Sequence, residues 1–381
     1  MAKGNKILVI SSLMPGATAF YLIRELRSIG HELSVISDID DECVSEVHYG
    51  VVDIQAWIGR SGFRPDAILF IEGGTRRLFP SGMEYLDCPS AWYAIDTHIH
   101  PDLHARTARL FDISFVAQRE FLSLFAASEA HWLPLAADPA LNPEKQPERD
   151  LDVAYVGSDN RALHPERALL LDAIRARYSK VFIGRAAPAH IGEIYSRAKI
   201  VFNKSARNDV NMRYFEAMAA GAALVTDRTS GNGVEELFSP GKDFLEYEDE
   251  SSLFATIDRL LSDDFEREGI GQHGKETVLS RHTYGQRAER IAKVLLACPH
   301  RIRPAPSDYL PVYHLLRFPD GVLSQAQKSL AWMRSNGDRN PLLAMAILFL
   351  HPLAGVLLWG YRLRYRLRYR GEFRAGQRRS K

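Results

Sequence analysis

Three side chains suited to binding a phosphorylated ligand occur close together in the chain: Asn211, Arg213 and Glu216. Arginine presents a fork of donors that matches phosphate oxygens, and a helix start offers free amide hydrogens and the positive end of the helix dipole. Glu216 lies one turn after Arg213 on the same helical face, where its carboxylate can accept hydrogen bonds from ribose hydroxyls. The alternative is an Arg213–Glu216 ion pair on the surface of an ordinary helix.

The surrounding residues predict the elements that would position this group. Residues 200–202 form a short β-branched and aromatic run that is typical of a buried parallel strand. After a polar loop, Asn211 is a good N-cap, and residues 212–220 carry apolar side chains at helical spacing. Gly221 is a natural helix stop, and residues 223–225 read as the next buried strand.

Further candidates for contact with phosphate or sugar follow predicted strands of the same half of the chain. Gly157 and Ser158 form a turn after one strand, and backbone amides in such a turn can approach phosphate. Lys204 follows a second strand, and Gly231 and Gly233 follow a third. Each has an alternative. Gly157 and Ser158 could form a plain strand-to-helix turn, Lys204 could be a solvated loop lysine, and Gly231 and Gly233 could form an ordinary flexible turn.

The run from residue 199 to 238 resembles the C-terminal domain of GT-B glycosyltransferases of group 1, including the spore-maturation-protein-like members. The matching positions are Asn211, Arg213, Phe215, Glu216, Ala217, Ala219, Gly221, Ala222 and the segment Glu235-Glu236-Leu237-Phe238. The resemblance implies an α/β protein with two Rossmann-like, doubly wound domains that face a cleft. It implies transfer of a sugar from a nucleotide-sugar donor to a hydroxyl, with no other cofactor and no required metal. It places Glu216 on the ribose, and Arg213, Lys204 and the amides near Asn211 and Gly157 on the diphosphate.

The chain departs from this family at one position. Many retaining members carry two glutamates eight residues apart, and eight positions before Glu216 stands Asn208, with Asp209 beside it. The resemblance implies retention of the anomeric configuration. Because the first glutamate is absent, the residues themselves do not decide between retention and inversion. The missing carboxylate also supports an alternative, a catalytically inactive GT-B scaffold or binding protein at the membrane.

The N-terminal half, residues 1–137, predicts a first Rossmann-like domain, because apolar strands alternate with helical stretches. Ligands of such sheets lie beyond the carboxyl ends of the strands. Asp96 and His98 follow the strand predicted over residues 90–95 and are our acceptor-side catalytic candidates, since a carboxylate or an imidazole can take up a hydroxyl proton. The alternatives are a helix cap at Asp96 and partly exposed loop histidines at His98 and His100.

Composition is that of an ordinary globular enzyme, with 46% hydrophobic and 25% charged residues among 381. The three cysteines have no metal-binding spacing and fit a reducing compartment. Asp38 and Asp40 form an Asp-x-Asp motif, which we interpret as a solvated acidic turn and not as a metal site. The turn at Gly157 lacks the GxGxxG pattern, which argues against a nicotinamide oxidoreductase.

A second domain over residues 151–297 would carry the nucleotide-sugar, and residues 298–381 would form a helical extension. Within it, residues 342–360 are apolar except for His351 and contain Pro352, and residues 361–381 hold nine Lys or Arg and one acidic residue, a net charge of +8. Such a pair of segments predicts attachment to an anionic membrane surface. Because a single span would separate the basic tail from the catalytic body, we expect an interfacial or re-entrant hairpin at Pro352; a helical pair packed on the protein is the alternative. The predicted location is the cytoplasmic face of the plasma membrane, with a glycan or lipid-linked acceptor and no nucleic-acid partner.

Overall fold

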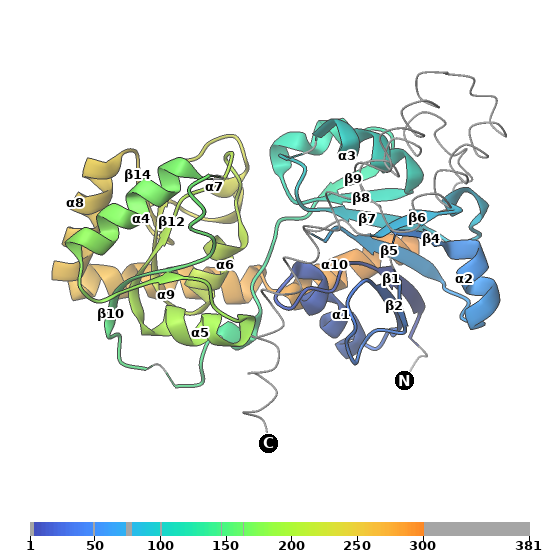
Figure 1. Ribbon diagram of the computed structural model, residues 1–381, viewed down its shortest axis with the longest axis horizontal. Helices are drawn as coiled ribbons and strands as arrows, with labels where there is room; N and C mark the ends of the chain where they lie inside the picture. Colours follow the sequence, from blue (N-terminus) through green and yellow to red (C-terminus); the bar gives the residue numbers. More distant parts are fainter. Residues whose placement is uncertain are drawn as a thin grey trace.

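The structure is a computed structural model that describes residues 4–300, apart from positions 49, 74–77, 100, 146 and 163. Two parallel sheets lie side by side in two lobes (Figure 1). The segments expected at 342–360 and 361–381 lie outside the described residues, and so does His100. None of the helices in the described part is long and apolar enough to cross a bilayer.

The first lobe is built on a seven-stranded sheet in the order β3-β2-β1-β5-β7-β8-β9, with every neighbouring pair parallel. Its central strands are continuous apolar runs because helices cover both faces of such a sheet; residues 7–10 of β1, for example, are fully buried. The strands are β1 (Lys6–Ile10), β2 (Glu32–Ser37), β3 (Glu46–Val47), β5 (Ala67–Ile71), β7 (Ser90–Ala94), β8 (Ile113–Val116) and β9 (Glu129–Trp132).

Helices and short elements complete this lobe. The helices are α1 (Thr18–Ser28), α2 (Ile54–Ser61) and α3 (Pro101–Thr107), and β4 (Gly50–Asp53) pairs with β6 (Leu78–Ser81). The 3-10 segments are η1 (Met83–Tyr85), η2 (Ala108–Leu110) and η3 (Arg119–Phe125). A fourth, η4 (Pro139–Leu141), follows the crossing and packs against residues 188–197 and 212–219 of the second lobe.

The second lobe has a five-stranded parallel sheet in the order β11-β10-β12-β13-β14. Its strands are β10 (Leu151–Val156), β11 (Val181–Gly184), β12 (Ala198–Asn203), β13 (Ala223–Asp227) and β14 (Leu245–Tyr247). Its helices are α4 (Pro165–Arg177), α5 (Pro188–Arg197), α6 (Met212–Ala219), α7 (Val234–Leu237), α8 (Glu250–Ser262) and α9 (Asp264–Arg281). The last helix, α10 (Tyr284–Ala297), leaves this lobe and packs against α1 of the first (Figure 1).

Helix α6 begins and ends where the sequence predicts. The Asn211 side chain accepts a hydrogen bond from the Arg213 amide, as an N-cap does. At the other end Gly221 has a φ of 76°, a left-handed conformation that glycine adopts without strain. The helix therefore starts after the loop of residues 204–211 that leaves the carboxyl end of β12, a position from which its amide end can reach a ligand.

The described chain crosses between the lobes twice, and the two crossings are hydrogen-bonded to each other. The Ala137 amide donates to the His282 carbonyl at 3.0 Å, and the Tyr284 amide donates to the Ala137 carbonyl at 3.1 Å. Beside them the ring of Tyr284 stacks on Tyr21 of α1, with the ring centroids 4.8 Å apart. One apolar core continues from the first lobe into the second across this junction.

We expect Thr283→Ala to lower the free energy of unfolding by about 1 kcal/mol, the usual cost of losing an N-cap. Thr283 and Gln286 form a reciprocal capping box at the start of α10, which holds the second crossing in place. Urea unfolding followed by circular dichroism measures the difference. The matched control is Ser280→Ala, because the exposed Ser280 hydroxyl bonds only within its own helix. Equal effects of the two substitutions would contradict a stabilising cap.

Candidate functional site

Loops that leave the carboxyl ends of strands in the two sheets meet at the boundary between the lobes. Arg207 Nη1 donates to the His98 carbonyl at 3.1 Å, and Gln118 Nε2 donates to Asp209 Oδ1 at 3.0 Å. Farther along, Arg119 Nε lies 2.6 Å from Glu236 Oε1. We call this boundary the interlobe seam. It brings the predicted Asp96–His98 loop of the first lobe against the loop that precedes α6 in the second.

The loop before α6 has an unusual backbone at Arg207 and Asn208, whose φ angles are 53° and 67°. Left-handed conformations cost energy for residues other than glycine and often mark functional sites. Asn208 Nδ2 donates to the Ser230 carbonyl at 2.8 Å, and its Oδ1 accepts from the Ser230 amide at 3.3 Å. A carboxylate accepts but does not donate, so it could not make this pair of bonds. At the position where two-glutamate relatives have a carboxylate, this chain therefore uses an amide to join two loops.

Asp209 is the carboxylate that reaches the seam from this loop. Its pKa is raised to about 7, mainly by burial and also by the charges of Asp96 and Glu120, while the hydrogen bond from Gln118 opposes the shift. A carboxyl group with this pKa exchanges its proton near neutral pH, which is the range that suits a general acid or base.

Arg213 lies across the carboxyl end of β10. Its Nε and Nη2 donate to the Val156 carbonyl at 3.2 and 2.7 Å, and its Nη1 donates to Asn203 Oδ1 at 2.6 Å. The guanidinium also lies over the ring of Tyr155, 4.2 Å from the centroid, a favourable cation–π arrangement. These contacts hold the guanidinium group at the start of α6, the place where the sequence predicts that Arg213 binds the diphosphate of the donor.

Glu216 is buried, with 9% of its surface exposed. Burial raises its pKa to about 7, and Arg213 partly offsets that effect. The same carboxyl group raises the pKa of Tyr21 in α1, so it lies close to the first lobe. The alternative of a surface Arg213–Glu216 ion pair is therefore wrong, because the glutamate is buried.

Comparisons with known proteins agree with this architecture. Residues 143–293 match the family described as "Glycosyl transferase-like". The matched segment includes all five strands of the second lobe. Similar solved structures include sucrose-phosphate synthase from Thermosynechococcus elongatus, with 13% identity over 76% of this chain and 98% of that one and a TM-score of 0.57. HepE of Anabaena, solved with UDP and glucose, has 12% identity over 77% and 100% and a TM-score of 0.56. A glycosyltransferase from Rickettsia africae has 10% identity over 77% and 98%, also with a TM-score of 0.56. No curated protein matches the chain significantly.

A buried network that the sequence did not predict holds the Asp96–His98 loop. Glu72 Oε2 accepts from the amides of Ile95 and Asp96 at 2.8 and 3.0 Å. Its Oε1 lies 3.2 Å from His104 Nε2, and His104 Nδ1 lies 3.0 Å from Thr97 Oγ1. The position of Glu72 directly after a buried strand was a usable signal. His104 on α3 offered none.

Lys204 is paired inside the second lobe. Its Nζ lies 3.0 Å from Asp227 Oδ2, and its carbonyl accepts from Arg167 Nη2 at 3.0 Å. Arg167 is buried, with 8% of its surface exposed. The ammonium group of Lys204 borders a polar cavity of about 340 Å³, whose other lining residues are Asp227, Arg228, Thr229, Ser230, Tyr247 and Glu248.

Of the residues predicted to approach the donor through their backbone, Gly157, Ser158 and Gly233 contact other parts of the protein. The Gly157 amide donates to the Gly184 carbonyl at 2.8 Å, so the predicted contact of this amide with phosphate is wrong in this conformation. Ser158 accepts from Tyr155 through its carbonyl. At Gly233 a Cβ would lie 2.5 Å from Arg119 Cδ and 2.8 Å from the Trp132 ring, so the first lobe, not a ligand, approaches this residue.

Gly231 is exposed, with open space around its Cα. Its contact with the donor stays a prediction.

The Asp-x-Asp motif differs from its interpretation as a solvated turn, because Asp38 is buried and only Asp40 is exposed. Among the described residues no cluster of three His, Cys, Asp or Glu side chains has the arrangement of a metal site.

Proposed function

We propose that this chain is an active glycosyltransferase that moves a sugar from a nucleotide-sugar donor to a hydroxyl acceptor. The observation that carries the proposal is the interlobe seam, where the Asp96–His98 loop meets the loop before α6 through the Arg207–His98 contact. The family match of residues 143–293 supports it. HepE, which has a similar fold, was solved with UDP-glucose.

In the proposed reaction the nucleotide lies in the second lobe with its ribose on Glu216. The acceptor oxygen forms a bond to the anomeric carbon, and the bond from that carbon to the diphosphate breaks, leaving its electron pair on the diphosphate. Arg213, Lys204 and the first amides of α6 would stabilise that charge, and preorganised donors of this kind each contribute ~10²–10³ in rate. Asp96 or His98 would accept the acceptor proton. By the family pattern we propose retention of configuration without a metal, which in a single displacement requires the acceptor oxygen to attack from the face on which the diphosphate leaves.

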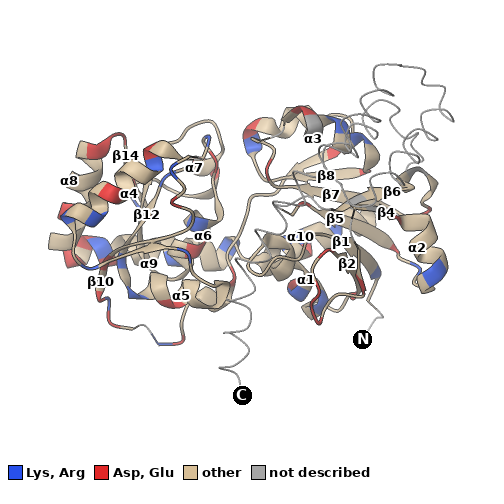
Figure 2. Ribbon diagram, viewed as in Figure 1, with Lys and Arg blue, Asp and Glu red and all other residues tan. Residues whose placement is uncertain are grey.

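The acceptor we propose is a glycan or a lipid-linked sugar at the inner face of the plasma membrane. The proposal depends on the sequence of residues 361–381, whose net charge of +8 suits anionic lipids. The described helices α8 and α9 carry acidic and basic side chains side by side (Figure 2), so they offer no single-sign surface to a nucleic acid.

A second candidate is a GT-B binding protein without catalytic activity. The observation that favours it is the engagement of the Asn208 side chain with Ser230, since this position cannot supply the first carboxylate of the two-glutamate pattern. The test below separates the two functions, because a binding protein would be stabilised by a donor without hydrolysing it.

We expect one donor among UDP-glucose, GDP-mannose and dTDP-glucose to raise the melting temperature of the full chain, since a ligand at 100 times its Kd stabilises by about 2.7 kcal/mol. The same donor should be hydrolysed slowly when water replaces the acceptor. NADH is the negative control for the oxidoreductase interpretation. Stabilisation by NADH alone, or by none of the sugar nucleotides, would refute the proposed function.

A further inference from the structure

Gln118, the residue that follows the strand end of β8 by two positions, connects both lobes at a single side-chain amide. Its Nε2 donates to Asp209 Oδ1 at 3.0 Å and to the Ile95 carbonyl, and its Oε1 accepts from the Thr97 amide at 3.3 Å. Gln118 is itself buried, with 3% of its surface exposed. Because it binds the chain on both sides of Asp96, it holds that residue and Asp209 in the same small region.

The charged groups around Asp209 come from three elements. Asp96 lies on the loop after β7 and Glu120 on η3, and both interact electrostatically with Asp209. The cation of its own loop, Arg207, directs its Nη1 at the His98 carbonyl. All three carboxylates are partly buried, and carboxylates that interact at close range titrate as a coupled group that shares protons.

We propose that Asp96 and Asp209, one from each lobe, together form the proton-accepting unit of the transfer reaction, held together by Gln118. This inference rests on the proposed function and replaces a single base with a cross-lobe pair. The acceptor O–H proton passes to the Asp209 carboxylate as the oxygen bonds to the anomeric carbon and the diphosphate leaves with its electron pair. Asp209 thus supplies a carboxylate that the adjacent Asn208, engaged with Ser230, does not.

A consequence of this arrangement is that the base is complete only while the lobes are in contact. If the seam opens, Asp209 separates from Gln118 and Asp96. In the open state the base is incomplete and donor hydrolysis is slow; closure both completes the base and excludes bulk water from the donor, as it does in other enzymes with moving domains.

The test compares Asp209→Asn with the wild type in donor hydrolysis, with kcat and KM measured from pH 5 to 9. The probe is whichever of UDP-glucose, GDP-mannose and dTDP-glucose stabilises the chain. We expect wild-type kcat to rise with pH, with a midpoint near pH 7. Asp209→Asn should lower kcat by about 10²–10⁴-fold and should abolish the rise of kcat with pH. KM should stay within about threefold of the wild-type value. Glu120→Gln is the matched control: it should move the midpoint to lower pH and keep kcat.

Folding of the variant is checked independently. The pKa of Asp209 is higher in the folded protein than in the unfolded chain, so the folded state binds more protons, and its stability falls as pH rises between about 4 and 7. Asp209→Asn removes this loss, and its melting temperature should exceed that of the wild type above pH 7 and match it near pH 4.

The outcomes are distinguishable. If a donor stabilises the wild type but Asp209→Asn keeps both kcat and the pH step, the cross-lobe pair is wrong and the proposed function stands. If no donor binds, the proposed function itself fails.

Discussion

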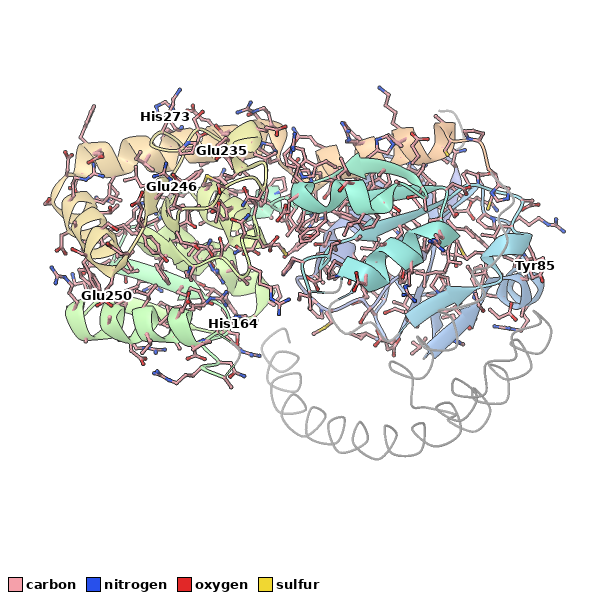
Figure 3. All side chains as sticks on the ribbon, turned by 90° about the horizontal axis from the view of Figure 1, so that it is seen from above. Tyr85, His164, Glu235, Glu246, Glu250 and His273 are labelled. Carbon is pink, nitrogen blue, oxygen red and sulfur yellow. The ribbon has the colours of Figure 1, made fainter. Side chains whose placement is uncertain are left out.

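Replacing Glu216 by glutamine is expected to weaken donor binding by roughly 10- to 100-fold, because a hydrogen bond to a charged group contributes about 1.5–3 kcal/mol. Glutamine has the same shape but lacks the carboxylate that would accept both ribose hydroxyls. Titration calorimetry with the stabilising nucleotide-sugar measures the change. The control is Glu250→Gln, since Glu250 is exposed on α8 at the outer end of the second lobe (Figure 3).

The same substitution should change stability in the opposite direction. The folded-state pKa of Glu216 is about 7, above its ordinary value of 4.5. The folded protein therefore binds more protons than the unfolded chain, and stability decreases as pH rises through this interval. Glu216→Gln removes that decrease and should stabilise the protein by about 2–3 kcal/mol at pH 8–9, with little effect at pH 4. Unchanged donor affinity in this more stable variant would exclude Glu216 from the nucleotide site.

The second large effect is expected for Arg287→Met. Arg287 is buried on α10 and donates to the carbonyls of Pro134, Leu135 and Arg281 at 2.8, 3.1 and 3.2 Å. Methionine fills much of the volume but leaves these carbonyls without the charged donor, and each loss costs about 1–3 kcal/mol. We expect a total destabilisation of about 3–5 kcal/mol, measured by thermal and urea unfolding.

Arg290→Met is the matched control, since Arg290 is exposed on the same helix. A further readout is His282, whose pKa is lowered to about 4, first by burial and then by the Arg287 charge, with Nδ1 2.9 Å from Arg287 Nη2. Removing the guanidinium should raise that pKa, observable by NMR titration. If both arginine variants unfold alike, the hydrogen bonds of Arg287 to these carbonyls do not stabilise the fold.

Local signals in the sequence were sufficient to predict α6 and the strands around it. Asn211, the apolar positions of the helix and Gly221 each act through contacts a few residues apart, so the pattern contains the information. The same holds for β1, because its continuous apolar run predicts a strand buried on both faces of the sheet. The membrane extension and most of the predicted donor contacts remain predictions.

The interactions across the lobes were not predictable in this way. Gln118 and Asp209 are 91 residues apart, and neither has a neighbour pattern that signals the other. Arg167 has the spacing of a surface residue, yet its guanidinium turns inward to the Lys204 carbonyl. The spacing of apolar residues indicates which face of a helix or strand is buried. It does not indicate which side chain of a distant segment packs against that face. Asp38 illustrates the same limit, because an acidic turn reads as solvated until another segment packs over it.

The hydrogen bonds between the two chain crossings constrain how the molecule can move. Because Ala137 is bonded to both His282 and Tyr284, the crossings must bend as one unit, and a rotation of the lobes has its axis near this junction. Displacement grows with distance from a rotation axis. The pairs that it carries apart are therefore side-chain contacts such as Arg119–Glu236, which can break and re-form with each turnover while the backbone pivot stays intact.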